Sequence, residues 1–430
     1  MASTAKRKTT LWVASTYFAE GMPYAVIRSL TGIYLTDIGI AESALGRINF
    51  WLALPWNLKF LWAPAVDLTS TRRRWLLAVQ AGLALGVLGL VAFAALGPAV
   101  VPSGTTVAGL AETTPIRLLV TLLVALAALA ATHDIAIDAY YMEAIPDAAT
   151  AAAYTGVRNV AYRLAVVFVR SGLVWLAGAV AWSWSFAGAA AALATLALLH
   201  AWILPTLAVR PPRTEGMPAM FRDFGAAFGS FVRQPRAPLI LLFLVAYKLG
   251  DEVLFSMNTP FLKRELGVRN EDLAWIAGLV GTWASIGGSL VSAWAISRFG
   301  LRRAVWPLTL GMNINILAYV WLAWVHPDAH TASGLWTIAA VHGYEQVAAG
   351  LGNAVLVVYI MRICDVRFRA AHYAIGSAIT PLGGTVFNYV AGSIVEKSGY
   401  MTLYLLAFAL AIPSMLCLFA LPMPEPRPGE

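Results

Sequence analysis

The sequence predicts an all-α membrane protein with twelve transmembrane helices in two six-helix halves, and three observations lead to this prediction. Of the 430 residues, 60% are apolar and only 12% are charged, which lies outside the range of soluble globular domains. Apolar runs such as 75–96, 187–204 and 401–421 reach the roughly 20 residues that a helix needs to cross the hydrocarbon core. A charged pattern at 67–73 also recurs at 297–303. Because lipid cannot satisfy unpaired backbone groups, open sheets are excluded.

The expected spans are apolar windows bounded by charged residues, proline or glycine. We place them near 11–35, 43–66, 75–97, 115–143, 152–178, 183–205, 237–262, 273–297, 303–325, 333–361, 368–395 and 400–421. The two halves are then 1–205 and 237–430, joined by a linker over 206–236. Since the number of spans is even, both termini are expected on the same side of the membrane.

The linker carries aromatic residues at helical spacing, at Phe221, Phe224, Phe228 and Phe231. This spacing predicts a short amphipathic helix that lies on the membrane surface and joins the two halves. A helix that docks a partner protein is the alternative.

The basic residues indicate the orientation of the chain. With the termini inside, the cytoplasmic segments hold 18 Lys and Arg and the outer segments hold six, and cytoplasmic loops are enriched in these residues. Both termini are therefore expected in the cytoplasm. The formal net charge of +8 is collected at span ends and forms no single stripe, so a nucleic-acid partner is not expected.

The recurring pattern lies at the loop between the second and third spans of each half. An acid or hydroxyl at a helix end, Asp67 or Ser297, is followed five and six residues later by two arginines. This resembles the cytoplasmic loop motif of the major facilitator superfamily, in which acid and bases pair across helices and lock one conformation. The resemblance implies a gating role for Asp67, Arg72, Arg73, Arg298 and Arg302. A loop that only sets topology is the alternative.

Charged residues inside the spans are concentrated in a few helices. Spans three, six, nine and twelve have no acidic or basic residue in their interiors, whereas others carry Glu20, Arg28, Asp134, Asp138, Arg158, Arg163, Arg170, Lys248, Asp251, Glu252 and Glu345. Charge is costly at membrane depth and usually borders a water-filled path. In two six-helix halves, the first and fourth helices of each half line the central cavity. The charged residues therefore predict a solute path.

The hairpin of the fourth and fifth spans suggests two ion pairs. Counting from Asp147 in the turn puts Asp138 at the depth of Arg158, and Asp134 at the depth of Arg163. In the functional interpretation, the bases bind an anionic group of the solute in one state of the transporter. In the other state the same bases pair with the acids. In the structural interpretation, the pairs only hold the helices together.

The seventh span contains one base and two acids on one helical face. Lys248 reaches Asp251 at i+3 and Glu252 at i+4, but one lysine can neutralise only one of them. The surplus carboxyl group would be able to take up a coupled proton near neutral pH. The sequence leaves open whether Asp251, Glu252 or Glu345 has this part.

An enzymatic alternative depends on a short motif. His133 and Asp138 have the H-x4-D spacing that some acyltransferases use for base catalysis, which would make the chain an intramembrane enzyme. No nucleophile or acid cluster accompanies the motif, so we expect no enzymatic activity. We also find no G-x-x-x-x-G-K-[ST] loop, so the chain is not expected to couple transport to ATP hydrolysis. Asp134 and Asp138 are two carboxylates four residues apart, but this is a weak match to a divalent-metal site, and we expect no metal or other cofactor.

Several segments resemble AmpG-type permeases of the major facilitator superfamily. They are Leu58–Pro64 with Asp67, Asp134–Tyr140, Tyr162–Leu164 and Tyr247–Asp251, in register over most of the chain. The resemblance implies proton-dependent import of cell-wall anhydro-muropeptides across the bacterial inner membrane. It makes Asp134, Asp138, Arg163, Lys248 and Asp251 candidates for transport. This chain departs from the family in two places. Glu20 and Arg28 lie in a first span that is less charged in AmpG-type permeases, and His133 stands where they usually have Gln.

Together these observations predict a monomeric secondary transporter, a symporter that imports an amphiphilic anionic solute such as a muropeptide or amino-sugar conjugate. A permease for a siderophore or an acyl-CoA-type solute is the alternative. The expected partners are the small-molecule solute, protons and the lipid bilayer. The expected solute-binding residues are Arg28, Tyr24, Arg158, Arg163, Lys248 and Asn353. The expected proton-coupling residues are Glu20, Asp134, Asp138, Asp251, Glu252 and Glu345.

Overall fold

The computed structural model describes residues 2–63, 66, 70–96, 114–207 and 217–423, which contain helices and no strands. Contacts divide the chain into two compact units. Unit 1 comprises 1–44, 51–214 and 269–279, and unit 2 comprises 45–50, 215–268 and 280–430. Each unit therefore consists mainly of one half of the chain and includes a short segment from the other. The expected boundaries at 205 and 237 stay a prediction.

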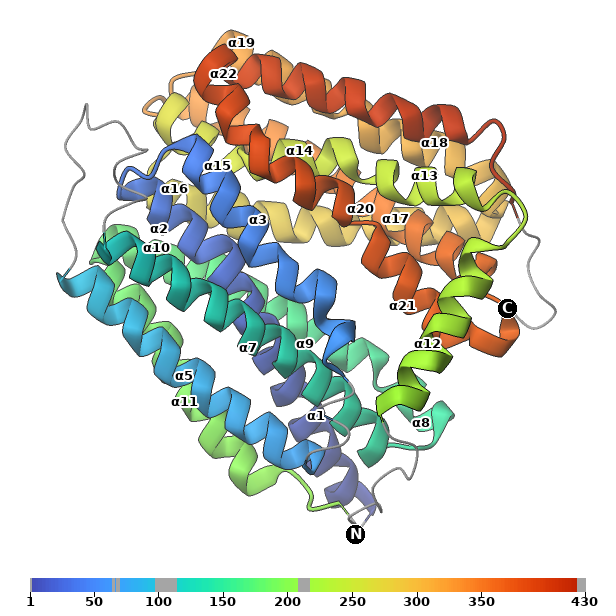
Figure 1. Ribbon diagram of the computed structural model, residues 1–430. Coiled ribbons are helices and arrows are strands. Elements are labelled where there is room, and N and C mark those ends of the chain that lie inside the picture. The colour runs from blue at the N-terminus through green and yellow to red at the C-terminus, as the bar shows by residue number, and fades with distance from the viewer. Residues whose placement is uncertain (1, 64–65, 67–69, 97–113, 208–216, 424–430) are drawn as a thin grey trace. The chain divides into compact units, whose positions relative to one another are not determined.

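Unit 1 is a bundle of long helices in which α1 packs on α7, α9 and α11, and α5 packs on α7 and α11 (Figure 1). Its elements are α1 (Ala2–Ala25), η1 (Val26–Leu30), α2 (Thr31–Asp37), most of α3 (Glu42–Leu58), η2 (Lys59–Leu61), α5 (Arg72–Leu96), α7 (Thr114–Ala144), α8 (Ala148–Ala153), α9 (Thr155–Val167), η3 (Phe168–Leu173), α10 (Val174–Ala179) and α11 (Trp182–Ile203). The segment from the second half adds α16 (Asn270–Leu273) and the start of η5 (Ala274–Val280). Asn270 Nδ2 there donates to Asp37 Oδ2 at 2.7 Å.

The first span is one helical run with a local change of winding. Pro23 lies inside α1, and η1 follows it as a π-helical turn before α2 continues. Proline has no backbone N–H, and its ring clashes with the carbonyl four residues earlier. One π-helical turn is a usual way for a helix to absorb such a disturbance. The turn contains Arg28, so the irregular winding occurs at a charged position of the span.

Unit 2 is built around α20, which packs on α17, α18, α19 and α21. Its elements are α12 (Met217–Val232), α13 (Ala237–Tyr247), α14 (Leu249–Ser256), α15 (Asn258–Pro260), η4 (Phe261–Glu265), α17 (Gly281–Phe299), α18 (Leu301–Ile314), α19 (Ile316–Val325), α20 (Ala332–Ile363), η6 (Val366–Phe368), α21 (Arg369–Ile379) and α22 (Leu382–Cys417). Two glycines with positive φ interrupt the helical chain. Gly300, with φ of 77°, separates α17 from α18, and Gly399, with φ of 80°, breaks the helix within α22. Only glycine adopts this backbone conformation without steric cost.

The described residues contain eight helical stretches that are long and apolar enough to cross a bilayer, judged by length and composition. The stretch Ala371–Cys417 has 47 residues and includes the break at Gly399, so it covers the last two expected spans. The eight stretches do not include the first, second and seventh expected spans. The helices at these three spans are interrupted by irregular winding or carry charge. All twelve expected spans contain helix, but the count of twelve crossings stays a prediction.

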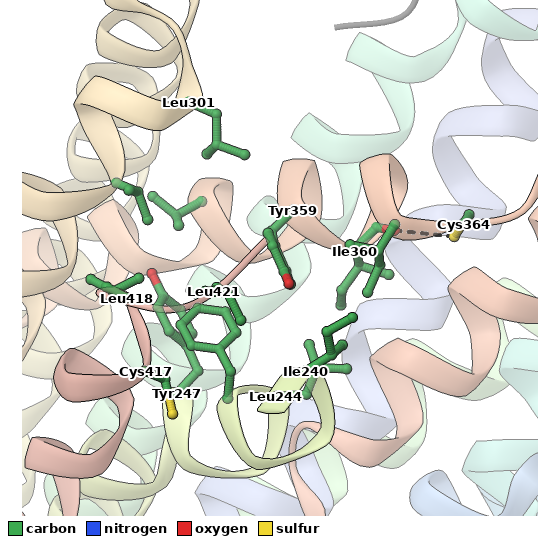
Figure 2. Close-up of a cluster of buried hydrophobic side chains, with 14 of the residues drawn as sticks. Ile240, Leu244, Tyr247, Leu301, Tyr359, Ile360, Cys364, Cys417, Leu418 and Leu421 are labelled. Atoms are coloured by element: carbon green, nitrogen blue, oxygen red, sulfur yellow. Dashed lines mark hydrogen bonds between the residues drawn. The ribbon is translucent and has the colours of Figure 1, made fainter. Parts of the chain in front are cut away.

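An apolar cluster in unit 2 holds α13, α18, α20 and α22 together (Figure 2). Tyr247, Tyr359 and Ile360 are almost fully buried in it, and Tyr247 OH donates to the carbonyl of Gly352 at 3.2 Å. Cys364 and Cys417 are free thiols buried in the same cluster. Burying large side chains of this kind contributes about 1.5–3 kcal/mol each to stability, so the cluster stabilises the packing of α20 on its neighbours.

The linker contains the helix α12, which docks on α21 through a buried histidine. His372 Nε2 donates to the carbonyl of Ala227 at 3.1 Å, and His372 Nδ1 accepts from the backbone N–H of Asp365 at 3.1 Å. These two bonds require the neutral ring with its proton on Nε2. Phe231 packs edge-on against the ring, whereas Phe228 is exposed. The side chains of Phe221 and Phe224 lie outside the described residues, and the position of α12 on a membrane surface stays a prediction.

Replacing His372 by alanine is expected to loosen α12. The change leaves the Ala227 carbonyl and the Asp365 N–H without their partners, at a cost of about 1–2 kcal/mol. Amide hydrogen exchange over 217–232 should therefore become about tenfold faster. His330→Ala is the matched control, because His330 is an exposed loop residue. Equal exchange rates in the two variants would contradict the docking role.

Candidate functional site

The hairpin of α7 and α9 brings Asp138 and Arg158 together, as the sequence predicts. Arg158 Nη2 donates to Asp138 Oδ1 at 3.2 Å, and the two side chains are 30% and 48% exposed. Asp147 caps α8 in the turn by accepting from the backbone N–H and hydroxyl of Thr150 at 2.8 and 2.6 Å. These bonds hold the pKa of Asp147 below its usual range. The cap fixes the turn, and the turn sets the register of the pair.

Aromatic rings hold the Arg158 guanidinium in place. Its central carbon lies 4.2 Å from the ring centroid of Tyr17 and 4.4 Å from that of Tyr141. The Tyr17 hydroxyl also donates to Asp138 Oδ1 at 2.9 Å. Cation–π contacts orient a guanidinium without neutralising its charge. Arg158 thus presents a positioned positive charge that is still partly accessible.

Asp134 does not pair with Arg163, so this part of the prediction is wrong. Asp134 Oδ2 lies 3.5 Å from Lys59 Nζ and accepts from Trp56 Nε1 at 3.0 Å. The end of α3 and η2 approach α7 at this depth and supply both donors. Arg163 is half-buried on α9 and makes no ion pair with any residue that the structure describes. It is therefore a cation with no counterion in the described chain.

An aromatic pair lies next to the Lys59–Asp134 pair. Tyr24 on α1 is 40% exposed, and its ring meets that of Trp56 edge-on with centroids 5.2 Å apart. Flat apolar rings beside charged groups suit a solute that has both apolar and anionic parts. Arg28 is half-buried one turn further along, in η1.

Glu20 lies on α1, where this helix packs closely against α9. A Cβ atom on the next residue, Gly21, would lie 2.8 Å from the Tyr162 carbonyl oxygen, so the two backbones nearly touch. Glu20 interacts electrostatically with Asp138, Asp134, Lys59 and Arg158. Its Oε2 atom is buried and accepts no hydrogen bond from the described residues. Glu20 therefore lies amid the two ion pairs and belongs to neither.

Gly21→Ala is expected to separate α1 from α9. The added methyl group would overlap the Tyr162 backbone, and overpacking of this kind costs about 1–3 kcal/mol of unfolding free energy. Gly32→Ala is the matched control, because a Cβ there meets nothing within 4 Å. The control should gain up to about 1 kcal/mol from helix propensity. Chemical unfolding in detergent would measure both changes, and equal midpoints would contradict the close contact.

Unit 2 holds a second ionic cluster, which is more deeply buried. Lys248 Nζ donates to Asp251 Oδ2 at 2.7 Å, and the two residues are 8% and 5% exposed. This is the i+3 contact that the sequence predicts. Lys248 also interacts electrostatically with Glu252 and Glu345. One lysine thus faces three carboxyl groups in this unit.

Glu345 on α20 is fully buried in a polar group formed by three helices. Its Oε2 accepts from Gln346 Nε2 at 3.0 Å and lies 4.0 Å from His342 Nδ1. Tyr319 OH on α19 bonds His342 Nδ1 at 2.8 Å and accepts from Asn258 Nδ2 at 2.9 Å. Asn353 lies two turns further along α20 and is half-buried.

Comparisons with known proteins identify the family. The chain is 30% identical over 412 residues to the anhydromuropeptide permease of Escherichia coli, covering 93% of this chain and 77% of that protein. This chain belongs to the AmpG-type permeases of the major facilitator superfamily. It is therefore a multi-pass membrane protein and a secondary active transporter, and not an enzyme.

Further comparisons agree with this membership. A family model described as Major Facilitator Superfamily matches residues 249–430 of the permease, and one described as Acetyl-coenzyme A transporter 1 matches residues 16–169. A protein of Haemophilus influenzae is 28% identical over 418 residues, covering 94% of this chain and 92% of that protein. The crystal structure of a D-xylose–proton symporter matches with a TM-score of 0.69 at 14% identity, covering 96% of this chain and 97% of that one. This last match shows the fold alone.

The expected gating residues of the permease have mixed outcomes. Asp67 lies outside the described residues. Arg72 pairs with Glu143 at the end of α7, and Arg73 donates to the carbonyls of Ala201 and Leu204 at 2.7 and 3.3 Å. Arg298 and Arg302 are exposed and make no ion pair with a described residue. The bases of the first loop thus hold α5 to α7 and α11, whereas those of the second loop have no described partner.

The histidine and aspartate of the enzymatic alternative do not form a catalytic pair in the permease. His133 is fully buried, and neither ring nitrogen has a hydrogen-bond partner among the described residues. Asp138 is instead bound by Tyr17 and Arg158. A general base must be within hydrogen-bond reach of its partner and its substrate, and this ring is not.

The sequence interpretation missed several residues that complete the ionic sites of unit 1, among them Trp56, Lys59, Glu143 and the two tyrosines that contact Arg158. Lys59 is a basic residue inside the second expected span, which is the signal that singled out the other intramembrane charges. Glu143 is next to the turn before α8 and looks like an ordinary helix-end residue. No sequence spacing links Glu143 to Arg72, because these residues meet through packing of α5 on α7.

Proposed function

We propose that this permease imports an anhydro-muropeptide, or a related amphiphilic anionic amino-sugar conjugate, together with protons. The observation that carries the proposal is the 30% sequence identity to the anhydromuropeptide permease over 93% of this chain. The site of unit 1 supports it, since positioned cations near the exposed ring of Tyr24 and the half-buried ring of Trp56 fit a solute with carboxylates and sugar rings.

The orientation and assembly are part of the same proposal. The permease acts as a monomer in the bacterial inner membrane, with both termini in the cytoplasm. Its halves are 1–205 and 237–430, and the linker over 206–236 joins them on the cytoplasmic side. The excess of Lys and Arg in the segments on that side supports this orientation.

The residue roles follow from charge and accessibility. We assign the anionic groups of the solute to Arg28, Arg158 and Arg163, with Tyr24 against its apolar part. Lys248 and Asn353 are assigned to solute binding in unit 2. Proton coupling is assigned to the carboxyl groups Glu20, Asp134, Asp138, Asp251, Glu252 and Glu345. In unit 2, the three carboxyl groups Asp251, Glu252 and Glu345 interact with one cation, Lys248. Such an excess of acids over bases is what a proton-binding cluster requires. Gating is assigned to Asp67, Arg72, Arg73, Arg298 and Arg302.

Counterflow in proteoliposomes tests the proposal. Vesicles that contain the purified permease and unlabelled anhydro-muropeptide should take up the radiolabelled compound, and an inward proton gradient should drive its accumulation. Vesicles without protein are the control. Lack of exchange would overturn the proposed solute, and lack of accumulation would overturn the proposed coupling to protons.

A second candidate solute is an acyl-coenzyme A. The match of residues 16–169 to the model described as Acetyl-coenzyme A transporter 1 favours it, because this stretch contains most of the site in unit 1. The pyrophosphate and 3′-phosphate of such a solute would also require positioned cations. Acetyl-coenzyme A added to the counterflow assay decides between the two. It competes with the muropeptide if the second candidate is right and has no effect if the first is right.

A further inference from the structure

Unit 1 contains three carboxyl groups and two cations in mutual contact or electrostatic range. Lys59 pairs with Asp134, and Arg158 pairs with Asp138. Glu20 interacts with all four, yet it forms no ion pair with a described residue, and its Oε2 is a buried atom without a hydrogen bond. An ionised carboxylate in this position would have no counterion of its own, which is costly because its Oε2 atom is buried.

We propose that Glu20 is the carboxyl group that holds the transported proton in unit 1. This inference rests on the proposed function of a proton-coupled permease. With a proton bound, Glu20 is neutral, and the cluster then balances two positive against two negative charges. The residue after Glu20, Gly21, is where α1 and α9 approach each other closely, so the carboxyl group is carried on a tightly packed stretch of α1.

The groups that face Glu20 from each neighbouring helix support this assignment. Its own helix and each neighbouring helix supply one or two of these groups. They are Tyr17 on α1, Lys59 on η2, Asp134 and Asp138 on α7, and Arg158 and Tyr162 on α9. Two of the other polar groups on the packed elements have partners elsewhere, whereas Arg163 on α9 makes no ion pair and His133 on α7 has no hydrogen bond with a described residue. His200 on α11 bonds Gln80 and Ser15, and Arg170 on η3 donates to Ser29.

Solute binding would change the charge around Glu20 in the direction that symport requires. A solute carboxylate that pairs with Arg158 neutralises this cation and leaves Asp138 without its counterion. Both changes make the surroundings of Glu20 more negative, and a more negative environment favours the protonated carboxyl group. The proton moves from water to a Glu20 carboxylate oxygen, and no other bond changes. Anionic solute and proton therefore bind with positive coupling, and each strengthens the binding of the other.

The test uses Glu20→Gln, which keeps the size of a protonated glutamic acid and removes its titration. In proteoliposomes that contain the purified permease, this variant should still exchange labelled for unlabelled anhydro-muropeptide. It should lose accumulation driven by an inward proton gradient and reach only the equilibrium level. Glu396→Gln is the matched control, because Glu396 is exposed on α22; it should accumulate solute like the unmodified protein. Gradient-driven accumulation by Glu20→Gln would overturn the inference, whereas lack of accumulation by the unmodified protein would overturn the proposed function instead.

An infrared measurement tests the same inference without any solute. The unmodified permease should show the carbonyl stretching band of a protonated carboxylic acid that titrates with pH. This band should be reduced in Glu20→Gln and unchanged in Glu396→Gln. An identical band in both variants would overturn the assignment of the proton to Glu20, whatever the solute is.

Discussion

Lys248→Met is expected to lower the free energy of unfolding of the permease by about 3–5 kcal/mol and to abolish transport. Lys248 and Asp251 are both nearly inaccessible, and their charged atoms are 2.7 Å apart. Removing the lysine leaves Asp251 as a buried carboxylate that has lost its cation, near Glu252 and Glu345. The cost arises mainly from this uncompensated charge and not from the lost attraction, because desolvation already offsets much of the attraction in a buried pair.

The double variant Lys248→Met, Asp251→Asn separates the two contributions. It removes both charges and should recover most of the stability that the single variant loses, while transport stays absent if the pair has a part in the transport cycle. Urea or thermal unfolding in detergent measures the first effect, and counterflow measures the second. A double variant that transports at the original rate would show that the pair only holds α13 and α14 in place. Equal stability of the single variant and the unmodified protein would contradict the buried pair itself.

The charged residues of the spans could be predicted from the sequence because lipid makes charge exceptional. The same argument explains why Asp138 meets Arg158: in a helical hairpin, depth follows from counting residues away from the turn, and both residues are near one turn. The same count failed for Asp134 and Arg163. Depth says nothing about rotation around the helix axis, and Asp134 faces the end of α3 instead of α9.

Contacts between helices far apart in sequence could not be predicted. Lys59 and Asp134 are brought together by packing of η2 on α7, and Arg72 and Glu143 by packing of α5 on α7. Such contacts depend on which face of each helix is buried, and an apolar membrane helix carries little of that information because lipid-facing and core-facing residues are both apolar. The π-helical turns at η1 and η3 were not predicted for a similar reason. Pro23 signals a disturbance, but it does not say whether the helix kinks, ends or changes its winding.

Arg158→Gln is expected to abolish or strongly reduce solute transport with a much smaller loss of stability than Lys248→Met. The Arg158–Asp138 pair is partly exposed, and such pairs contribute about 0–1 kcal/mol. The contacts with Tyr17 and Tyr141 add a similar amount. A charge-assisted hydrogen bond to a solute anion is worth about 1.5–3 kcal/mol, so solute binding should weaken about 10- to 100-fold.

Two further variants show whether Arg158 acts through its charge, its geometry or its packing. Arg158→Lys keeps the charge but lacks the planar guanidinium that contacts both the Tyr17 and the Tyr141 ring, and it should transport at an intermediate rate. Arg303→Gln removes an exposed arginine on α18 and should have no effect on binding. Equilibrium binding of labelled anhydro-muropeptide and unfolding midpoints, measured on the same preparations, distinguish the outcomes. If Arg158→Gln binds the solute normally but unfolds as easily as Lys248→Met, then the guanidinium holds α1, α7 and α9 together, and the solute anion must be bound by another cation, for which the unpaired Arg163 would be the first to test.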